Sequence, residues 1–286
     1  MDQNTNLTVK FAPYTDEVFT NESKTSLITN QDFDWTGART VKIWKFKTAK
    51  MNDYSRNIFD GEETNPSRYG KLYDLKAETE EMMLSKDRSF IFNVDKLDTD
   101  ETQGELSAAK ALARQIREVV IPERDKYIFD KIVNNSKVLN ITLQEDLKPD
   151  NIYSHILKTG EFMDASAAPD TNRVLVVTPG VYSIIKQAKI LDNSDIGADL
   201  RTKGVISMLD GMKVIKIPDF ILPKDVKFMI IHPSAIVAPV KLQDYNVHRD
   251  TPLASGDVVT GRICYDAFIL DNKIGGIAIT KGKPTE

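Results

Sequence analysis

Cysteine and histidine are nearly absent from this chain of 286 residues. Cys264 is the single cysteine, and the only histidines are His155, His232 and His248. One thiol excludes a disulfide framework within the chain and a cysteine-rich zinc site. No two histidines stand at a metal-binding spacing. We therefore expect no metal centre, and we expect Cys264, whose neighbours are typical of a strand, to be a buried and inert thiol.

Long apolar runs are also absent. No stretch of about 18 apolar residues could form a membrane-spanning helix, and Met1–Lys10 lacks the apolar core of a signal peptide. The net charge of −4 excludes nucleic-acid binding that depends on overall positive charge, although 38 Lys and Arg allow a locally basic face. These features predict a protein with no membrane partner that is made in a reducing cytoplasm.

Catalytic motifs are present only as fragments. Gly256–Ile263 has the glycine spacing of a P-loop, but Arg262 and Ile263 replace the required Lys and Ser or Thr, so we interpret it as a turn between strands. Asp98 and Asp100 have the spacing of a phosphatase nucleophile loop, yet they do not directly follow a buried strand. A phosphatase that uses this pair remains the alternative from another functional class. We expect neither an enzyme nor a cofactor.

The N-terminal part of the chain contains a predicted hairpin against which no adjacent segment is expected to pack. Met1–Asp34 is polar and non-periodic, and is expected to be an extended arm that is ordered only if something else holds it. Arg39–Lys47 and Leu72–Ala77 alternate as the two strands of a hairpin. The polar stretch Met51–Tyr69 between them predicts a long loop of the functional kind. Because a two-stranded hairpin is marginal alone, we expect a neighbouring subunit to cover it.

A strand and a long helix are expected next. Met82–Val94 has the apolar centre of a strand, and apolar residues then recur at helical spacing over Gly104–Asn134, about 45 Å at 1.5 Å per residue. The polar cluster Asp98–Thr102 could cap this helix. Pro122 predicts a kink or a break within it. The polar side of the helix would carry Arg114, Arg117, Glu118, Arg124 and Asp125.

From Ile141 onward the pattern is mixed α/β. Helices are expected at Asp150–Ala165, with Ile152, Ile156, Leu157 and Phe162 on its apolar face, and at Val181–Ala188. The pattern predicts strands at Arg173–Val177, Ile206–Leu209, Met212–Ile217, Phe228–Ile231, Asp257–Leu270 and Ile274–Thr280. His155 would lie on a helix, His232 at the end of a strand and His248 in a loop. The fold class is therefore α+β.

Several strings, read in order, carry a family resemblance. They are Phe92–Asp95, Arg173–Tyr182, Gly204–Ile215, Ile217-Pro218, His232–Ala235, Lys241-Leu242, Val259–Arg262 and Tyr265–Lys273. Their order and spacing resemble the major capsid protein of tailed bacteriophages, which has the Hong Kong 97-type fold. The resemblance spans nearly the whole chain.

The resemblance implies a domain organisation. Residues 1–34 would be the N-terminal arm, 35–81 an extended loop that reaches over an adjacent subunit, and 82–140 the peripheral domain with its long spine helix. Residues 141–245 would form the axial domain, and 246–286 would be strands shared by the two domains. No scaffolding region fits before Trp35, so scaffolding is expected from a separate protein or from a segment removed by processing.

The resemblance also implies a function and partners. Pentamers and hexamers would tile an icosahedral shell around double-stranded DNA, which the subunit would contact non-specifically. The protein would assemble in the cytoplasm of a bacterial host, remain in the virion, and meet portal and other virion proteins. An encapsulin-like compartment shell is the alternative with the same fold.

Candidate inter-subunit residues follow from the expected loop and helix. In the loop they are Trp44, Lys45, Lys47, Asn52, Tyr54, Arg56, Arg68, Tyr69 and Lys71; on the polar face of the spine helix they are Arg114, Arg117, Glu118 and Arg124. Some relatives cross-link a loop lysine to a neighbour. Here Lys45, Lys47, Lys50 and Lys71 are available but are interpreted as ordinary solvated lysines.

Overall fold

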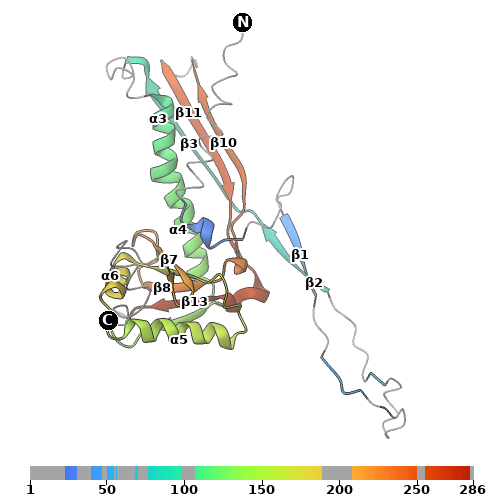
Figure 1. Cartoon of the computed structure of the whole chain (residues 1–286). Coiled ribbons are helices and arrows are strands. Elements are labelled where there is room, and N and C mark those ends of the chain that lie inside the picture. The colour runs from blue at the N-terminus through green and yellow to red at the C-terminus, as the bar shows by residue number, and fades with distance from the viewer. Residues whose placement is uncertain are drawn as a thin grey trace. The chain divides into compact units, whose positions relative to one another are not determined.

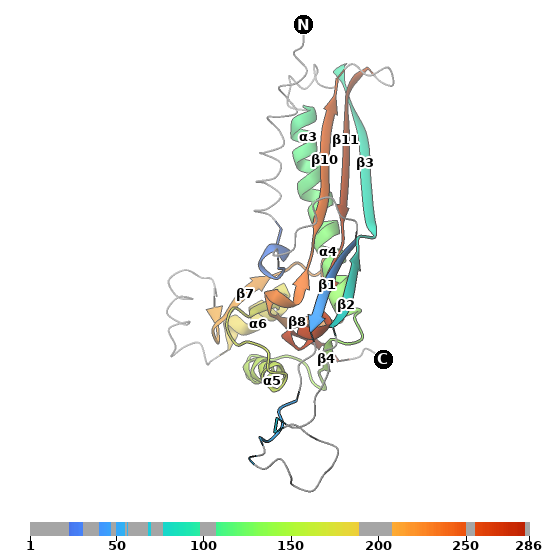
Figure 2. The same ribbon diagram turned by 90° about the vertical axis from the view of Figure 1, so that its right-hand side faces the viewer.

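The computed structural model describes residues 23–30, 40–46, 50–54, 56, 68–69, 77–97, 107–188, 208–249 and 255–283. The chain forms two compact units. One is the hairpin unit, Trp35–Leu84; the other is the main unit, made of Met1–Asp34 and Ser85–Glu286. Figures 1 and 2 show the elements of each unit.

The hairpin unit is built on two antiparallel strands, β1 (Thr40–Phe46) and β2 (Ala77–Met83). The first strand agrees with the prediction, and the second overlaps the predicted Leu72–Ala77 only at Ala77. The segment Leu72–Lys76 lies outside the described residues. The observed register pairs Lys42 with Glu81 and Lys45 with Glu78 along the backbone.

One end of the main unit is a three-stranded antiparallel sheet in the order β10-β11-β3. Its strands are β3 (Lys86–Asp95), β10 (Val240–His248) and β11 (Gly256–Tyr265). Helix α3 (Ala108–Gln115) runs alongside them (Figures 1 and 2). Ala108, Leu112 and Ile116 pack there with Val259 and Ile263 in one apolar cluster.

The spine helix is continuous rather than broken at Pro122. Helix α3 passes through a π-helical turn, η2 (Ile116–Val120), into α4 (Ile121–Val133). In this turn the Ile121 amide donates to the Ile116 carbonyl, and Pro122 stands in the first turn of α4, where its missing N–H costs little. The capping residue is Ser107, whose side chain accepts from the Lys110 amide. The expected cap, Asp98–Thr102, lies outside the described residues.

The other end of the main unit is a six-stranded sheet in the order β4-β13-β8-β5-β7-β6. Its strands are β4 (Leu139–Thr142), β5 (Val174–Val177), β6 (Met208–Leu209), β7 (Met212–Lys216), β8 (Val226–Ile231) and β13 (Ile277–Lys281). Strand β5 pairs in parallel with β7, and β13 in parallel with β4; β8 is antiparallel to both β5 and β13.

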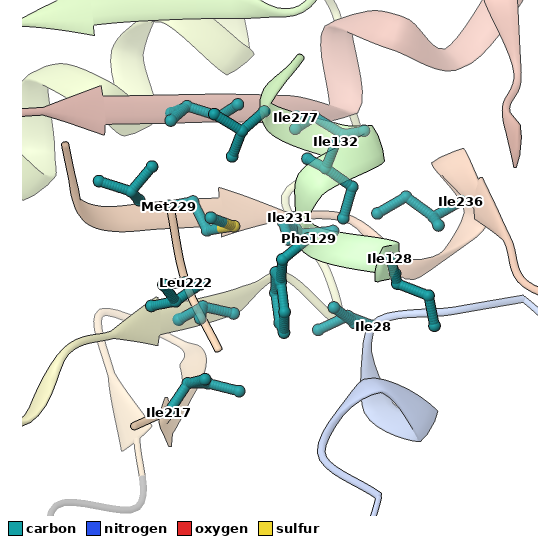
Figure 3. Close-up of a cluster of buried hydrophobic side chains, with 14 of the residues drawn as sticks. Ile28, Ile128, Phe129, Ile132, Ile217, Leu222, Met229, Ile231, Ile236 and Ile277 are labelled. Carbon is teal, nitrogen blue, oxygen red and sulfur yellow. The ribbon is translucent and has the colours of Figure 1, made fainter. Parts of the chain in front are cut away.

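Helices cover both faces of this sheet. On one face, Ile128, Phe129 and Ile132 of α4 pack with alternate strand residues (Figure 3). On the other face lie α5 (Ile152–Ala165) and α6 (Pro179–Gln187). A small pair of strands, β9 (Ile236–Val237) and β12 (Phe268–Ile269), and the short helices η4 (Pro233–Ala235) and η5 (Asp271–Gly276) complete the unit.

Several local predictions were wrong. The buried residues of α5 are Ile152, Ile156, Thr159 and Met163, while Leu157 and Phe162 are exposed. The sequence patterns missed β4, β9 and β10. The strand predicted at Asp257–Leu270 is interrupted after Tyr265, and the segment before Ile277 is η5 rather than strand.

Candidate assembly surfaces

The candidate residues of the loop lie partly within the described residues. Trp44 and Lys45 belong to β1, while Lys47 and Lys71 fall outside. Asn52, Tyr54, Arg56, Arg68 and Tyr69 are all exposed. The Asn52 side-chain amide donates to the Tyr69 carbonyl at 3.2 Å, and the Tyr54 and Tyr69 rings meet edge to face at 5.2 Å. These two contacts join Asn52 and Tyr54, near the start of the loop, to Tyr69 at its end, and leave polar and aromatic groups exposed to solvent.

The predicted polar face of the spine helix is only partly confirmed. Arg114 and Glu118 form an exposed ion pair one turn apart, with the Arg114 Nε 2.9 Å from the carboxylate, and Arg117 is also exposed. Arg124 is instead half-buried, and its guanidinium lies 3.4 Å from the Ala238 carbonyl. Burial lowers the pKa of Arg124. Arg124 therefore belongs to the packing between α4 and the β9–β10 connection.

Asp125 does not lie on the polar side of the helix either. Its side chain is buried, with 1% of the residue exposed. The carboxylate accepts hydrogen bonds from the Ser23 hydroxyl at 2.9 Å, the Thr25 hydroxyl at 2.8 Å and the Lys24 amide at 3.1 Å. Charge-assisted bonds of this kind are among the strong ones. Asp125 is thus an internal anchor for the segment that precedes the hairpin unit.

The segment Ser23–Asn30 bears on the expectation that the N-terminal arm is extended and ordered only if something else holds it. Around the short helix η1 (Thr25–Leu27) it docks into the main unit. Ile28 is fully buried in the cluster that also contains Ile128 and Ile236 (Figure 3). The Asn30 amide donates to the Ile236 carbonyl at 2.7 Å. This part of the arm is therefore held by its own chain.

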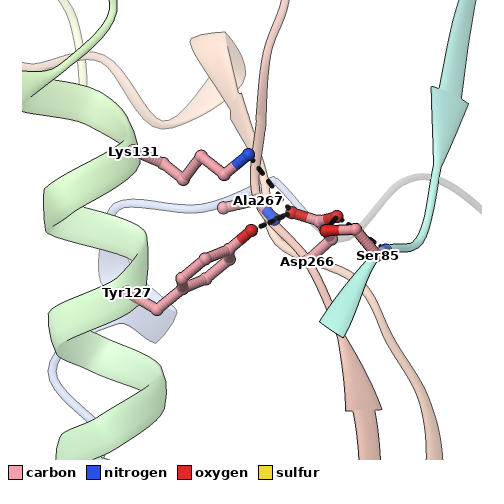
Figure 4. A network of polar contacts seen from close by, with 5 residues as sticks. All are labelled: Ser85, Tyr127, Lys131, Asp266 and Ala267. Atoms are coloured by element: carbon pink, nitrogen blue, oxygen red, sulfur yellow. Dashed lines mark hydrogen bonds and ion pairs between the residues drawn. The ribbon is translucent and has the colours of Figure 1, made fainter. Parts of the chain in front are cut away.

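A second buried carboxylate, Asp266, joins three segments of the main unit (Figure 4). Its oxygens accept from the Ser85 amide and hydroxyl at 2.9 and 2.7 Å, the Tyr127 hydroxyl at 2.7 Å and the Ala267 amide at 2.8 Å. The Lys131 ammonium lies 3.9 Å away. Burial alone would raise the pKa of Asp266, but the hydrogen bonds outweigh it and hold this pKa below its ordinary value. The carboxylate is therefore fully paired and structural.

The sheet face opposite α3 is polar and open. Arg262 makes two bonds to Asp87, at 2.9 and 2.6 Å, from the central strand to β3. The side chain of His248 lies 3.0 Å from the Thr260 hydroxyl, which places His248 at the end of β10 rather than in the predicted loop. Ile91 is exposed on the same face. Sequence patterns missed this surface because β10 was not predicted.

Of the two fragments of catalytic motifs, one is part of a strand and the other lies outside the described residues. Gly256–Ile263 is a continuous part of β11, so the interpretation as a turn was wrong. An added Cβ at Gly261 would overlap the ring of Phe90 across the sheet, which explains a glycine there. Asp98 and Asp100 lie outside the described residues. Cys264 is half-buried within β11.

The described ranges also bear on metal sites and membrane spans. Within those ranges, no cluster of three or more His, Cys, Asp or Glu residues has a geometry able to hold a metal ion. Among the helices that the structure describes, none combines the length and the apolar character needed to cross a membrane.

Comparison with known proteins depends on structure alone, since no protein-family model and no curated protein matches the sequence. A chain from Mycobacterium phage Che8 matches with a TM-score of 0.72 and 19% identity, covering 90% of each chain. A chain from the capsid structure of cyanophage P-SCSP1u matches with a TM-score of 0.68 and 12% identity, over 91% of this chain and 87% of that one. This chain has the Hong Kong 97-type capsid fold.

The Hong Kong 97-type architecture is also found outside the phage structures. A chain of the virus-like particle from Pyrococcus furiosus matches with a TM-score of 0.60 and 11% identity, over 96% of this chain and 99% of that one. The similarity to all three structures is in the arrangement of elements, with few shared residues. It therefore establishes the Hong Kong 97-type fold, while function has to be argued from the surfaces.

Proposed function

We propose that this chain is the major capsid protein of a tailed bacteriophage. It is a structural, non-catalytic subunit that assembles with copies of itself as pentamers and hexamers into an icosahedral shell around double-stranded DNA. The observation that carries the proposal is the fold shared over about nine-tenths of the chain with proteins from phage structures, one of them described as a capsid.

The domain organisation expected from the sequence is part of the proposal, with two refinements. The extended loop corresponds to the hairpin unit, Trp35–Leu84. Strand β10 crosses the expected boundary at residue 245 and, among the strands that the structure describes, pairs only with β11 in the three-stranded sheet. We therefore assign β10 to the peripheral domain together with β3, β11 and the spine helix, and the six-stranded sheet with α5 and α6 to the axial domain.

The candidate loop residues support an intersubunit role for the hairpin unit. Met51 and Tyr69 are 99% and 78% exposed, so both side chains are available for burial against a partner. Burial of such groups provides association energy at about 25 cal/mol per Å² before entropy costs. The exposed charges of Arg114, Arg117 and Glu118 would set register and partner choice more than affinity.

Other partners follow from the same proposal. Packaged DNA would be contacted through phosphates by local Lys and Arg, without sequence preference, against an overall acidic subunit. A separate scaffolding protein, a portal and other virion proteins would complete the particle. The protein would assemble in the bacterial cytoplasm and remain in the virion.

An encapsulin-like compartment shell is the second candidate, favoured by the match to the Pyrococcus furiosus particle. The higher TM-scores of the Che8 and P-SCSP1u chains favour the capsid. The contents of isolated particles separate the two functions. Nuclease-protected double-stranded DNA supports the capsid, whereas enclosed protein cargo without DNA supports the compartment.

Electron microscopy of the purified protein tests assembly. We expect uniform shells or capsomer rings, and a protein that stays monomeric at high concentration would contradict the proposal. Replacing Met51–Tyr69 by a short glycine–serine linker should leave a folded subunit and abolish shells, because the exposed tip is lost. As a control, a variant with the residues of this segment in scrambled order keeps its length and composition, and so separates the effect of sequence from that of length. Shells of normal yield from the linker variant would show that the loop is not an intersubunit clasp.

A further inference from the structure

Phe220 is an exposed aromatic side chain on a rigid turn. It lies between Pro218 and Pro223, beyond the carboxyl end of β7, and 67% of it is exposed. The Ile221 amide donates to the Pro218 carbonyl at 3.1 Å, and Ile221 and Leu222 are both buried. A phenyl ring held outward by buried neighbours loses little conformational entropy when it binds a partner.

Asp219 adds a negative charge beside this ring. It is exposed, and it makes no ion pair with any residue in the ranges that the structure describes. Asp219 and Phe220 together present a preformed acidic and aromatic projection, which we call the Phe220 turn. Aromatic groups of this kind are enriched among residues that dominate binding energy at interfaces.

A pocket of about 300 Å³ lies at the opposite end of the same strands. Strands β5 and β7 are parallel, and Val174 and Lys213 face each other where that pairing begins, whereas the Phe220 turn follows the last pair. The apolar lining is formed by Leu27, Val174 and Pro233. Its polar lining residues are Asn172, Lys213 and His232.

Lys213 gives this pocket one positive charge. None of its lining residues is acidic, and Lys213 is exposed and makes no ion pair within the described ranges. Burial lowers the pKa of His232, and the nearby cations Arg173 and Lys273 lower it further. A lowered pKa favours the neutral imidazole, so the charge of the pocket comes from Lys213. This ammonium group and the three apolar lining residues complement a carboxylate beside an aromatic ring.

Closed rings of identical subunits require two different complementary patches, one on each side of the subunit. The Phe220 turn and the pocket meet this requirement, because they lie at opposite ends of one sheet and carry opposite charge. We propose that in each pentamer and hexamer the Phe220 turn of one copy docks into the Leu27–Val174–Pro233 pocket of the next, with Asp219 beside Lys213. This inference rests on the proposed capsid function.

Charge reversal tests the contact directly. Asp219→Lys and Lys213→Asp should each reduce the yield of shells at least about tenfold, because each brings like charges together, and the double variant should restore the yield to within about threefold of the unmodified protein. Both substitutions are at exposed positions, and circular dichroism should show the same fold for all three variants. A double variant that assembles no better than the single variants would overturn the inference.

Phe220→Ala tests the aromatic part, with Phe162→Ala as a matched control, since Phe162 is also exposed but lies on α5. The first should lower shell yield at least about tenfold and the second less than about twofold. Equal yields from the two variants would contradict the inference.

Chemical cross-linking distinguishes failure of this contact from failure of the capsid proposal. In a Cys264→Ser background, Asp219→Cys and Lys213→Cys together should give a ladder of covalent oligomers up to the hexamer with a short thiol cross-linker, and each alone should give none. Shells without a ladder would refute the docking and leave the capsid function standing. Absence of any shell from the unmodified protein would instead refute the capsid function.

Discussion

Ile28→Ala provides a sharp test of how the N-terminal segment is held. Ile28 is fully buried among α4, β9 and the six-stranded sheet. Truncation removes three carbons from a packed site, and such changes cost about 2–5 kcal/mol because the cavity closes only in part. For a subunit of this size, we expect the unfolding midpoint to fall by roughly 5–15 °C.

The assay is thermal unfolding of unassembled subunits, followed by circular dichroism. Leu27→Ala is the matched control, because the adjacent side chain is 51% exposed and its truncation should cost less than about 0.5 kcal/mol. Limited proteolysis should cleave the Ile28 variant sooner in this segment. Equal midpoints for the two variants would refute the conclusion that the arm is part of its own core.

Two further predictions concern buried groups. The pKa of Asp266 is lowered in the folded state, so its stabilising effect is present above the unfolded pKa of about 3.9 and is lost as the pH falls through the folded value. Asp266→Asn should therefore flatten the loss of stability on acidification, measured by urea unfolding at a series of pH values; an unchanged slope would contradict this. Gly261→Ala should destabilise the subunit by about 1–3 kcal/mol through overlap with Phe90, and Phe90→Leu should relieve part of that cost. Gly180→Ala is the control, since no atom lies within 4 Å of its added Cβ; equal effects at the two glycines would disprove the overlap.

The elements that sequence could predict are those with a strong local period. The spine helix and β5 were found because apolar residues recur at helical spacing in one and form a continuous buried run in the other. Strand β10 was missed because most of its residues are only half-buried, so Val240–His248 shows no clear alternation. A strand whose two faces differ little in burial leaves a weak signal in sequence.

Contacts between distant segments could not be predicted in the same way. Asp125 looks like a solvent-facing helix residue until Ser23 and Thr25, about a hundred positions earlier, are placed against it. The exposure of Phe220 is equally non-local, because it depends on the burial of Ile221 and Leu222 in the cluster formed by α4 and the six-stranded sheet. Helical period specifies which residues share a face, but not which segment covers that face.

The π-helical turn at Ile116–Val120 has a consequence for how this chain tolerates insertions and deletions. Ala108 and Leu112, ahead of this turn, pack in the apolar cluster of the three-stranded sheet, and Ile128 and Ile132, beyond it, pack in a cluster of the six-stranded sheet. Each residue turns an α-helix by about 100°, so losing one position here would rotate one set of apolar side chains away from its sheet. The length of the π-helical turn therefore fixes how the two sets of apolar side chains are rotated relative to each other. We expect the number of residues in this turn to be more constrained than their types.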